Sequence, residues 1–342
     1  MSVLSASSKV MLRSPGAFAA ALPALVGFHP SQSLVAVYLG KGQVIVSMRL
    51  DVPESIEEVA EYVASTGTRV EADEVLLALY CPKGDDLPHR EGVAALITAC
   101  HEVHVNVRDA MLIDGGRLWS YMCRSIECCP SEGVEIPQES GLLEAERVGL
   151  GLPMVAESRE EVVQRYAPRL DLAPSREVRE QAQSILTVAL GERAKQVWDE
   201  VKMLAAAPVP ADHATDLMRS RIQVAFDNVI VRDYVMASIA LTADPAEGVV
   251  DVIVQAALTA PQDLRPRVAG AAAFLLAAFG ESSIATVCLL ELAEGQSLAE
   301  LVHISVNSAV SPGAMREVLR SSMPIIEEQL AAATRKPRRR KG

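Results

Sequence analysis

Residues 33–53 read SLVAVYLGKGQVIVSMRLDVP, and this stretch decides the fold of the first half of the chain. Two runs rich in Val, Leu and Ile flank the turn GKG at residues 40–42. β-Branched and aromatic residues favour strands, and two strands joined by a short Gly-containing turn form a hairpin. We therefore predict an antiparallel pair of strands at residues 33–40 and 43–53.

Helical patterns alternate with strand-like runs around this hairpin. Ser14 followed by Pro15 is typical of a helix N-terminus, and Gly27 of a helix end, so a helix is predicted at residues 15–26. Further helices are predicted at 54–65 and 88–100, and further strands at 74–81, 104–113 and 117–123. Because strands alternate with helices and hairpins close both ends, the pattern predicts an α/β or α+β domain with a mixed sheet and flanking helices.

The second half of the chain shows helical patterns throughout. A Ser-x-x-Glu capping box at Ser158 and Glu161 opens one helix, and residues 175–207 form a long helical pattern. Turns containing proline separate the segments that follow. A chain of 342 residues is long enough for two domains. We predict a mixed α/β domain at 1–150 that carries a cysteine cluster, an all-α domain at 151–330, and a disordered basic tail at 331–342.

The charges of the chain are unevenly placed. The formal net charge is −12, yet the last residues, RKPRRRKG, carry six cations: Arg335, Lys336, Arg338, Arg339, Arg340 and Lys341. Without them the net charge falls from −12 to about −18, and an acidic body repels nucleic acid. A nucleic-acid partner would therefore have to bind the tail. The alternative is that the tail is a disordered, solubilising end.

Cysteine usage and hydropathy predict a cytoplasmic protein without a membrane partner. Six cysteines in 342 residues are too few for a disulfide-built secreted scaffold. The apolar run near the N-terminus is interrupted by Pro23 and lacks a cleavage pattern, so it resembles a mature helix more than an export signal. The apolar run VAGAAAFLLAAFG at 268–280 is shorter than the about 18 to 20 residues that span a bilayer.

The stretch WSYMCRSIECCPSEG, residues 119–133, contains the densest chemistry in the chain. Three cysteines lie within seven positions: Cys123, Cys128 and Cys129. Structural zinc takes four nitrogen or sulfur ligands in a tetrahedron, and His101 or His104 in CHEVH could supply the fourth. Adjacent cysteines point apart, so a sharp turn, helped by Pro130, would be required. Zinc is the metal expected if the cluster holds one, and no other cofactor is identified.

Three other interpretations of the cluster stay open. Small buried thiols could simply close a loop at the end of the sheet. Cys123 could form a redox pair with Cys128 or Cys129, because a loop of this size can bring two Cα atoms to about 5.5 Å. A nucleophilic thiolate would need a neighbouring base, and the candidates are His101 and His104. These histidines are three positions apart, so they do not match the H-E-x-x-H pattern of zinc proteases.

A second candidate site is the loop CPKGDDLPH at residues 81–89. It follows a predicted strand and precedes a predicted helix, a position at which open α/β sheets bind ligands. The candidate ligand residues there are Asp85, Asp86 and His89. The alternative is an ordinary connection in which Asp86 caps the helix. The sequence contains no phosphate-loop, dinucleotide-binding or serine-hydrolase motif.

Several stretches resemble one known family. They are LRSPGAFAAALPALVGFHPSQSLVAVYL (12–39), VIVSMRLDVP (44–53), VRDAMLIDGGRLWSYMCRSIECCPSEGVEIP (107–137), AAAFLLAAFGESS (271–283) and SLAELVHISVNSAVSPGAMREVL (297–319). They are similar to the family named domain of unknown function 4192, found in high-GC Gram-positive bacteria and their viruses. Its most specific part is WSYxC followed by CCPxxG, so the resemblance implies that the cysteine cluster is a family feature. It implies no activity.

The expected function follows from the lack of a recognisable catalytic constellation. We predict a non-enzymatic protein that binds a protein partner or associates with itself as a homo-oligomer. One alternative is a small-ligand protein or an enzyme, with its site at Asp85, Asp86 and His89 or at a metal held by the cysteine cluster. Association of nucleic acid with the basic tail is the third interpretation.

Overall fold

The computed structural model describes residues 14–137, 154–206, 213–242, 248–279 and 283–334. Contacts divide the chain into two compact units. The first consists mainly of the residues up to Val162, and the second contains most of the remaining residues. The predicted domain boundary at residues 150–151 lies outside the described residues.

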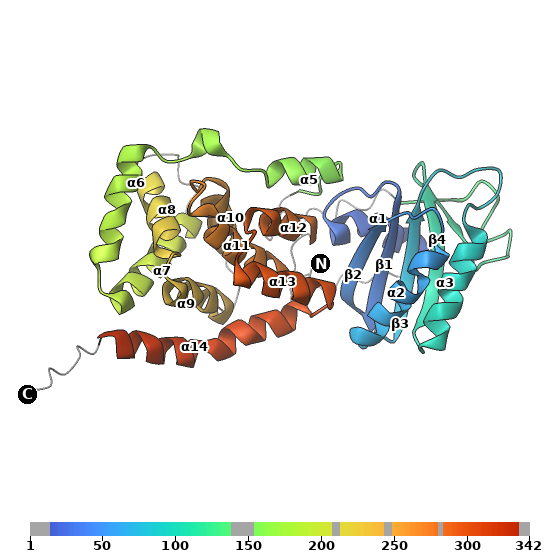
Figure 1. Ribbon diagram of the computed structural model, residues 1–342. Coiled ribbons are helices and arrows are strands. Elements are labelled where there is room, and N and C mark those ends of the chain that lie inside the picture. Colours follow the sequence, from blue (N-terminus) through green and yellow to red (C-terminus); the bar gives the residue numbers. More distant parts are fainter. Residues whose placement is uncertain (1–13, 138–153, 207–212, 243–247, 280–282, 335–342) are drawn as a thin grey trace, which may run out of the picture. The chain divides into compact units, whose positions relative to one another are not determined.

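The first unit is built on one mixed sheet. Its elements are α1 (Pro15–Val26), β1 (Ser33–Gly40), β2 (Gln43–Asp51), α2 (Glu57–Arg69), β3 (Glu74–Tyr80), α3 (Arg90–Glu102), β4 (Asn106–Asp114), β5 (Arg117–Ser120) and β6 (Val134–Glu135). The strand order is β2-β1-β3-β4-β5-β6, and the first four of these strands are labelled in Figure 1. β3 and β4 pair in parallel, and the other neighbours pair antiparallel. The prediction of a mixed sheet with flanking helices is confirmed.

Two-residue turns join the strands of the two hairpins. Lys41 and Gly42, with φ of 53° and 73°, connect β1 to β2. Gly115 and Gly116, with φ of 53° and 76°, connect β4 to β5. Turns with two positive φ values match the right-handed twist of the strands, and glycine adopts them at little cost.

Helices cover both faces of the sheet. α2 and α3 pack side by side on one face (Figure 1). Side chains alternate along a strand, so Val46 of β2 points toward these helices and Ser47 points to the opposite face. The Ser47 hydroxyl donates to the backbone oxygen of Leu25 at 3.4 Å, which places α1 on that opposite face. Every residue of β1 from Ser33 to Leu39 is buried, as expected for a strand covered on both faces.

The second half of the chain is helical. Its elements are α5 (Arg159–Arg165), η2 (Leu170–Leu172), α6 (Arg176–Ala182), η3 (Gln183–Thr187), α7 (Leu190–Ala206), α8 (His213–Ala225), α9 (Val229–Leu241), α10 (Val249–Leu258), α11 (Arg265–Phe279), α12 (Ser283–Leu292), α13 (Ser297–Asn307) and α14 (Pro312–Thr334). α11 is buried along most of its length and packs against α10 and α14. The prediction of a helical second half is confirmed. Among the helices that the structure describes, none combines the length and the apolar character needed to cross a bilayer.

The helix expected over residues 175–207 is interrupted. α6 passes into the 3-10 helix η3, and the next residue, Val188, has an extended backbone. β-Branched side chains such as Val188 lose rotamer freedom in a helix, which weakens the helical preference at this point. The Arg193 guanidinium donates to the carbonyl oxygens of Leu186 and Val188 at 2.6 and 3.0 Å. The carbonyl groups freed by the break therefore have a partner.

The last helix is longer than the sequence pattern predicts. α14 includes residues 331–334, which were expected to belong to a disordered tail. The remaining tail residues, 335–342, lie outside the described residues, and all six basic candidates are among them.

Candidate metal centre

The cysteine cluster lies in the loop that joins β5 to β6. At the end of β5, the Ser120 hydroxyl donates to a carboxylate oxygen of Asp109 on β4 at 2.7 Å. The same hydroxyl oxygen accepts the backbone N–H groups of Met122 and Cys123 at 3.1 and 3.0 Å. These bonds fix the start of the loop, and with it Cys123, relative to the sheet.

The far end of the loop is tied back to β5. The Trp119 ring N–H donates to the backbone oxygen of Ser131 at 3.0 Å, and Arg117 donates to that of Glu132 at 2.7 Å. Gly133 has φ of 79°, and a Cβ atom at this position would overlap the Trp119 ring. The close approach of the backbone to the ring therefore requires glycine here.

A single helical turn brings the adjacent cysteines together. The backbone N–H of Cys129 donates to the backbone oxygen of Ser125 at 2.8 Å. This turn places Cys128 and Cys129 beside Cys123. This turn spans residues 125–129 and ends directly before Pro130.

The three sulfur atoms form one group. The Sγ atoms of Cys123 and Cys128 are 2.7 Å apart, and those of Cys128 and Cys129 are 3.8 Å apart. All three lie within 4.8 Å of one another, and no disulfide joins them. Cys128 is exposed, and the other two are half-buried. The thiols of this loop are therefore not buried, contrary to that part of the loop-packing interpretation.

The sulfurs differ in their acidity. A hydrogen bond from the Cys128 thiol lowers the pKa of Cys123, because it stabilises the thiolate form. Burial, together with hydrogen bonds to Cys123 and Cys128, raises the pKa of Cys129 to about 12. Cys123 therefore ionises before Cys129, and a thiolate at Cys123 is stabilised by its thiol neighbours.

The geometry fits three ligands of a tetrahedral ion. Zinc–sulfur bonds of about 2.3 Å in a tetrahedron place neighbouring sulfurs about 3.8 Å apart. Cys128 and Cys129 already have this spacing. Cys123 and Cys128 would have to separate by about 1 Å, which the exposed position of Cys128 allows. The donor set thus suits zinc with one coordination position left over.

The structure does not bring the two candidate histidines to this group. His101 lies in the last turn of α3, and His104, with φ of 63°, lies in the turn before β4. Both are exposed. Within the described part of the chain, the group of metal-ligating side chains consists of the three cysteines alone. A fourth histidine ligand and a histidine base for a nucleophilic thiolate are therefore not part of this site.

The loop at residues 81–89, the second candidate site, does not bring its three candidate residues together. α3 begins at Arg90, two residues after the predicted start at residue 88. Its N-cap is His89, which has a left-handed backbone with φ of 51° and makes no side-chain capping hydrogen bond. The alternative role of Asp86 as the cap of this helix is therefore wrong. His89 borders a cavity of about 340 Å³ together with Glu54, Ser55, Glu57, Arg90, Glu91 and Gly92. Asp85 and Asp86 are exposed and do not line it, so the three candidates do not converge on one site.

Sequence reasoning missed the residues that position the cluster. Asp109 and Ser120 come together because β4 and β5 pair in one register. Burial raises the pKa of Asp109. The available signal was an acidic residue within a predicted strand, directly before the apolar run at residues 110–113, since a partly buried carboxyl group there needs a hydrogen-bonding partner.

Comparison with known proteins identifies a family. No curated protein and no solved structure matches the chain at a significant level. A family model does match residues 15–313, a span that includes the sheet, the cysteine cluster and the helices up to the start of α14. The match covers most of the 342 residues, and the chain therefore belongs to the family described as a domain of unknown function (DUF4192).

Proposed function

We propose that this protein binds a thiophilic metal ion, zinc in the first place, through Cys123, Cys128 and Cys129. The observation that supports the proposal is the grouping of three Sγ atoms within 4.8 Å on an exposed turn. Soft thiolate ligands favour zinc and copper(I) over magnesium or calcium. A tetrahedral ion with three protein ligands keeps one position for water or for another ligand.

The surrounding residues suit such a site. Cys123 supplies the first thiolate, because hydrogen bonding lowers its pKa. Ser120 and Asp109 hold the backbone at Cys123, and so orient the first ligand. Since Cys128 is exposed, solvent or a ligand group from a partner protein can reach the ion. The proposed site is thus a metal-dependent binding point.

Metal content per chain tests this proposal. Protein purified without chelator is expected to carry one zinc ion per chain by elemental mass spectrometry, and a Cys128→Ser/Cys129→Ser variant is expected to lose nearly all of it. Cys81→Ala is the matched control, because Cys81 is a buried thiol of the same unit outside the cluster. Circular dichroism verifies that each variant is folded.

Cobalt(II) adds a readout that identifies the ligands. Thiolate coordination produces an intense sulfur-to-cobalt charge-transfer band, which is expected in wild type and in Cys81→Ala and absent from the double variant. If metal-free wild type takes up neither zinc nor cobalt when supplied with an equimolar amount, the proposal is overturned.

Self-association is a second candidate function, supported by apolar side chains on two successive helices. Leu301 and Ile304 of α13 are 58% and 60% exposed. Val318 and Ile325 of α14 are 61% and 60% exposed. Residues three or seven positions apart share one helical face, so each helix presents an apolar strip to solvent. Such strips favour binding to another protein surface, including a second copy.

Sedimentation velocity tests self-association. Wild type is expected to form a concentration-dependent dimer at micromolar concentrations, and Ile304→Glu/Val318→Glu is expected to be monomeric, because a buried unpaired carboxylate strongly disfavours the interface. Leu170→Glu is the control, since Leu170 is equally exposed, at 61%, but lies on η2. A wild type that stays monomeric at the highest concentration reached, or a dimer that survives the double substitution, would rule out this surface.

A further inference from the structure

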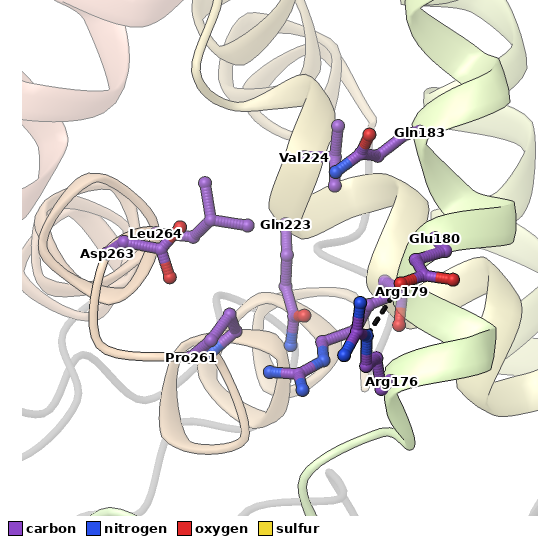
Figure 2. Close-up of a pocket in the computed structure, with 10 residues that line it drawn as sticks. Arg176, Arg179, Glu180, Gln183, Gln223, Val224, Pro261, Asp263 and Leu264 are labelled. Carbon is purple, nitrogen blue, oxygen red and sulfur yellow. Dashed lines mark hydrogen bonds and ion pairs between the residues drawn. The ribbon is translucent and has the colours of Figure 1, made fainter.

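The helical unit contains a cavity that neither the metal site nor the apolar strips use. Its volume is about 280 Å³, and it lies where α6, η3 and α8 meet the segment before α11 (Figure 2). The lining residues are Arg176, Arg179, Glu180, Gln183, Ser220, Gln223, Val224, Pro261, Asp263 and Leu264. Polar side chains from α6 and α8 thus face one space.

Two polar residues of α8 are buried at this cavity and have unused hydrogen-bonding capacity. Ser220 is 1% exposed, and its hydroxyl has no hydrogen-bond partner among the described residues. Gln223 is also 1% exposed, and its amide nitrogen donates to the backbone oxygen of Ala256 at 2.9 Å and to the Thr259 hydroxyl at 3.2 Å. Its amide oxygen accepts no hydrogen bond from the residues that the structure describes.

Buried polar groups without partners are rare in folded proteins, because no hydrogen bond offsets the free-energy cost of removing them from water. The Ser220 hydroxyl therefore needs an explanation beyond packing, and Gln223 has an unused acceptor oxygen. Both border the same cavity, and Figure 2 shows Gln223 pointing into it. A bound molecule with complementary groups would satisfy both residues.

The charges around the cavity indicate what that molecule carries. Arg176 is already paired with Glu180 at 2.7 Å. Arg179 is half-buried, and its guanidinium has no hydrogen-bond or ion-pair partner within the described ranges. Figure 2 shows Arg179 extending toward Pro261 and Gln223. A guanidinium binds carboxylate and phosphate oxygens with two parallel hydrogen bonds, so Arg179 is suited to an oxyanion.

The remaining side chains around the cavity indicate which chemical groups the other end of the ligand carries. The free amide oxygen of Gln223 requires a donor, and the exposed carboxylate of Asp263 favours a hydroxyl or an ammonium group over a second anion. Val224, Pro261 and Leu264 provide apolar contact for a short carbon skeleton. The donors and acceptors thus match a small molecule with an oxyanion at one end and a donor at the other.

We propose that this cavity binds a small organic oxyanion, a carboxylate or a phosphate monoester, that also carries a hydroxyl or ammonium group. Arg179 and Ser220 bind the oxyanion, and Gln223 accepts a hydrogen bond from the donor. The site belongs to the helical unit and is independent of the metal proposal.

Calorimetric titration of the full chain at neutral pH tests the ligand class with two pairs of probes. Glycine is compared with acetate, and glycerol 3-phosphate with methyl phosphate, because the first member of each pair adds the donor. We expect the donor-bearing member to bind more tightly in at least one pair, and the better pair identifies the ligand as a carboxylate or a phosphate. Absence of binding heat from all four probes at millimolar concentrations overturns the proposal.

One variant at the cavity and one control variant test whether binding occurs there. Arg179→Gln is expected to weaken binding by about tenfold or more, since it removes a charge-assisted contact. Lys195→Gln removes the same charge from an exposed position on α7 and is expected to leave affinity unchanged. Equal losses in these two variants would show a general charge effect and overturn the site.

Ser220→Ala separates a ligand contact from a structural role. Binding is expected to weaken by about three- to tenfold. The melting temperature of the ligand-free protein is expected to stay the same or rise, because the substitution removes a buried hydroxyl that is unpaired within the described ranges. A lower melting temperature with unchanged ligand affinity would assign Ser220 to the fold and contradict the proposal.

Discussion

Replacing Arg221 with Met is expected to lower the free energy of unfolding of the helical unit by about 3 to 5 kcal/mol. Arg221 on α8 forms an ion pair with Glu200 on α7, with Nη1 and Oε1 2.8 Å apart. The Glu200 side chain is 8% exposed, and Gln196 supplies one further hydrogen bond to the same oxygen at 3.2 Å. Without Arg221, a buried carboxylate is left without its counter-charge.

Replacing the other partner of the ion pair, Glu200, with Leu is expected to have a smaller effect on the free energy of unfolding. The Arg221 side chain is 24% exposed, so its guanidinium can turn toward water after Glu200→Leu. We expect a loss of about 1 to 2 kcal/mol in that variant. The double variant is expected to lie within about 1 kcal/mol of wild type. The reason is that Oε2 of Glu200 and Nε of Arg221 are buried and find no hydrogen-bond partner in the part of the chain that the structure describes, so the pair is imperfectly satisfied.

Urea denaturation followed by tryptophan fluorescence measures these changes. The chain has two tryptophans, Trp119 and Trp198, so a Trp119→Phe background makes Trp198 on α7 report the helical unit alone. Arg176→Met is the control, because it breaks an exposed ion pair and is expected to cost less than about 0.5 kcal/mol. Similar losses for Arg221→Met and Arg176→Met would contradict the argument that burial makes the pair necessary.

Local sequence patterns predicted those parts of the fold that local chemistry determines. The first helix runs from Pro15 to Val26 as predicted, because the Ser14 side chain caps its N-terminus and Gly27 ends it in a left-handed conformation. The predicted hairpin forms over residues 33–51, two residues shorter than predicted, because β-branched runs flank a two-residue turn. The match of the family model likewise confirms a resemblance that rests on contiguous stretches of sequence.

Features that depend on pairing between distant segments could not be predicted in the same way. The spacing of the cysteines made them visible, but the contact between Ser120 and Asp109 requires the register of β4 against β5. The start of α3 was placed two residues early, because the left-handed backbone of His89 is not evident from its residue type. The cavity at Ser220 and Arg179 joins segments some 40 residues apart whose helical patterns give no distance between them.

Acidification is expected to release the metal from the cysteine site, with affinity falling at least about tenfold for each pH unit below neutrality. The pKa of Cys129 is raised to about 12 by burial and by the neighbouring sulfurs, so this thiol carries its proton in the metal-free protein at neutral pH. A metal ion binds the thiolate, and binding therefore displaces that proton. Because protons compete with the ion, affinity must rise with pH and fall with acid.

Cys123 makes the pH dependence of metal affinity steeper at lower pH. Its pKa lies below the ordinary value for a thiol, so in the metal-free protein it gains a proton only when the solution becomes more acidic. Below that pKa, binding displaces one more proton, and the dependence becomes steeper by a further factor of about ten per pH unit. A curve that steepens toward acid is therefore the expected signature of the unequal sulfurs in this cluster.

Competition titrations with a chromophoric zinc chelator, repeated from about pH 8 to about pH 6, measure this dependence. Cys129→Ser is the control for the assignment, because it removes the group whose proton is displaced at every pH in this range. That variant is expected to bind zinc more weakly and with a pH slope lower by one proton. Affinity that does not vary with pH in wild type would mean that the ion binds groups already ionised, such as surface carboxylates. The three thiols would then be excluded as its ligands.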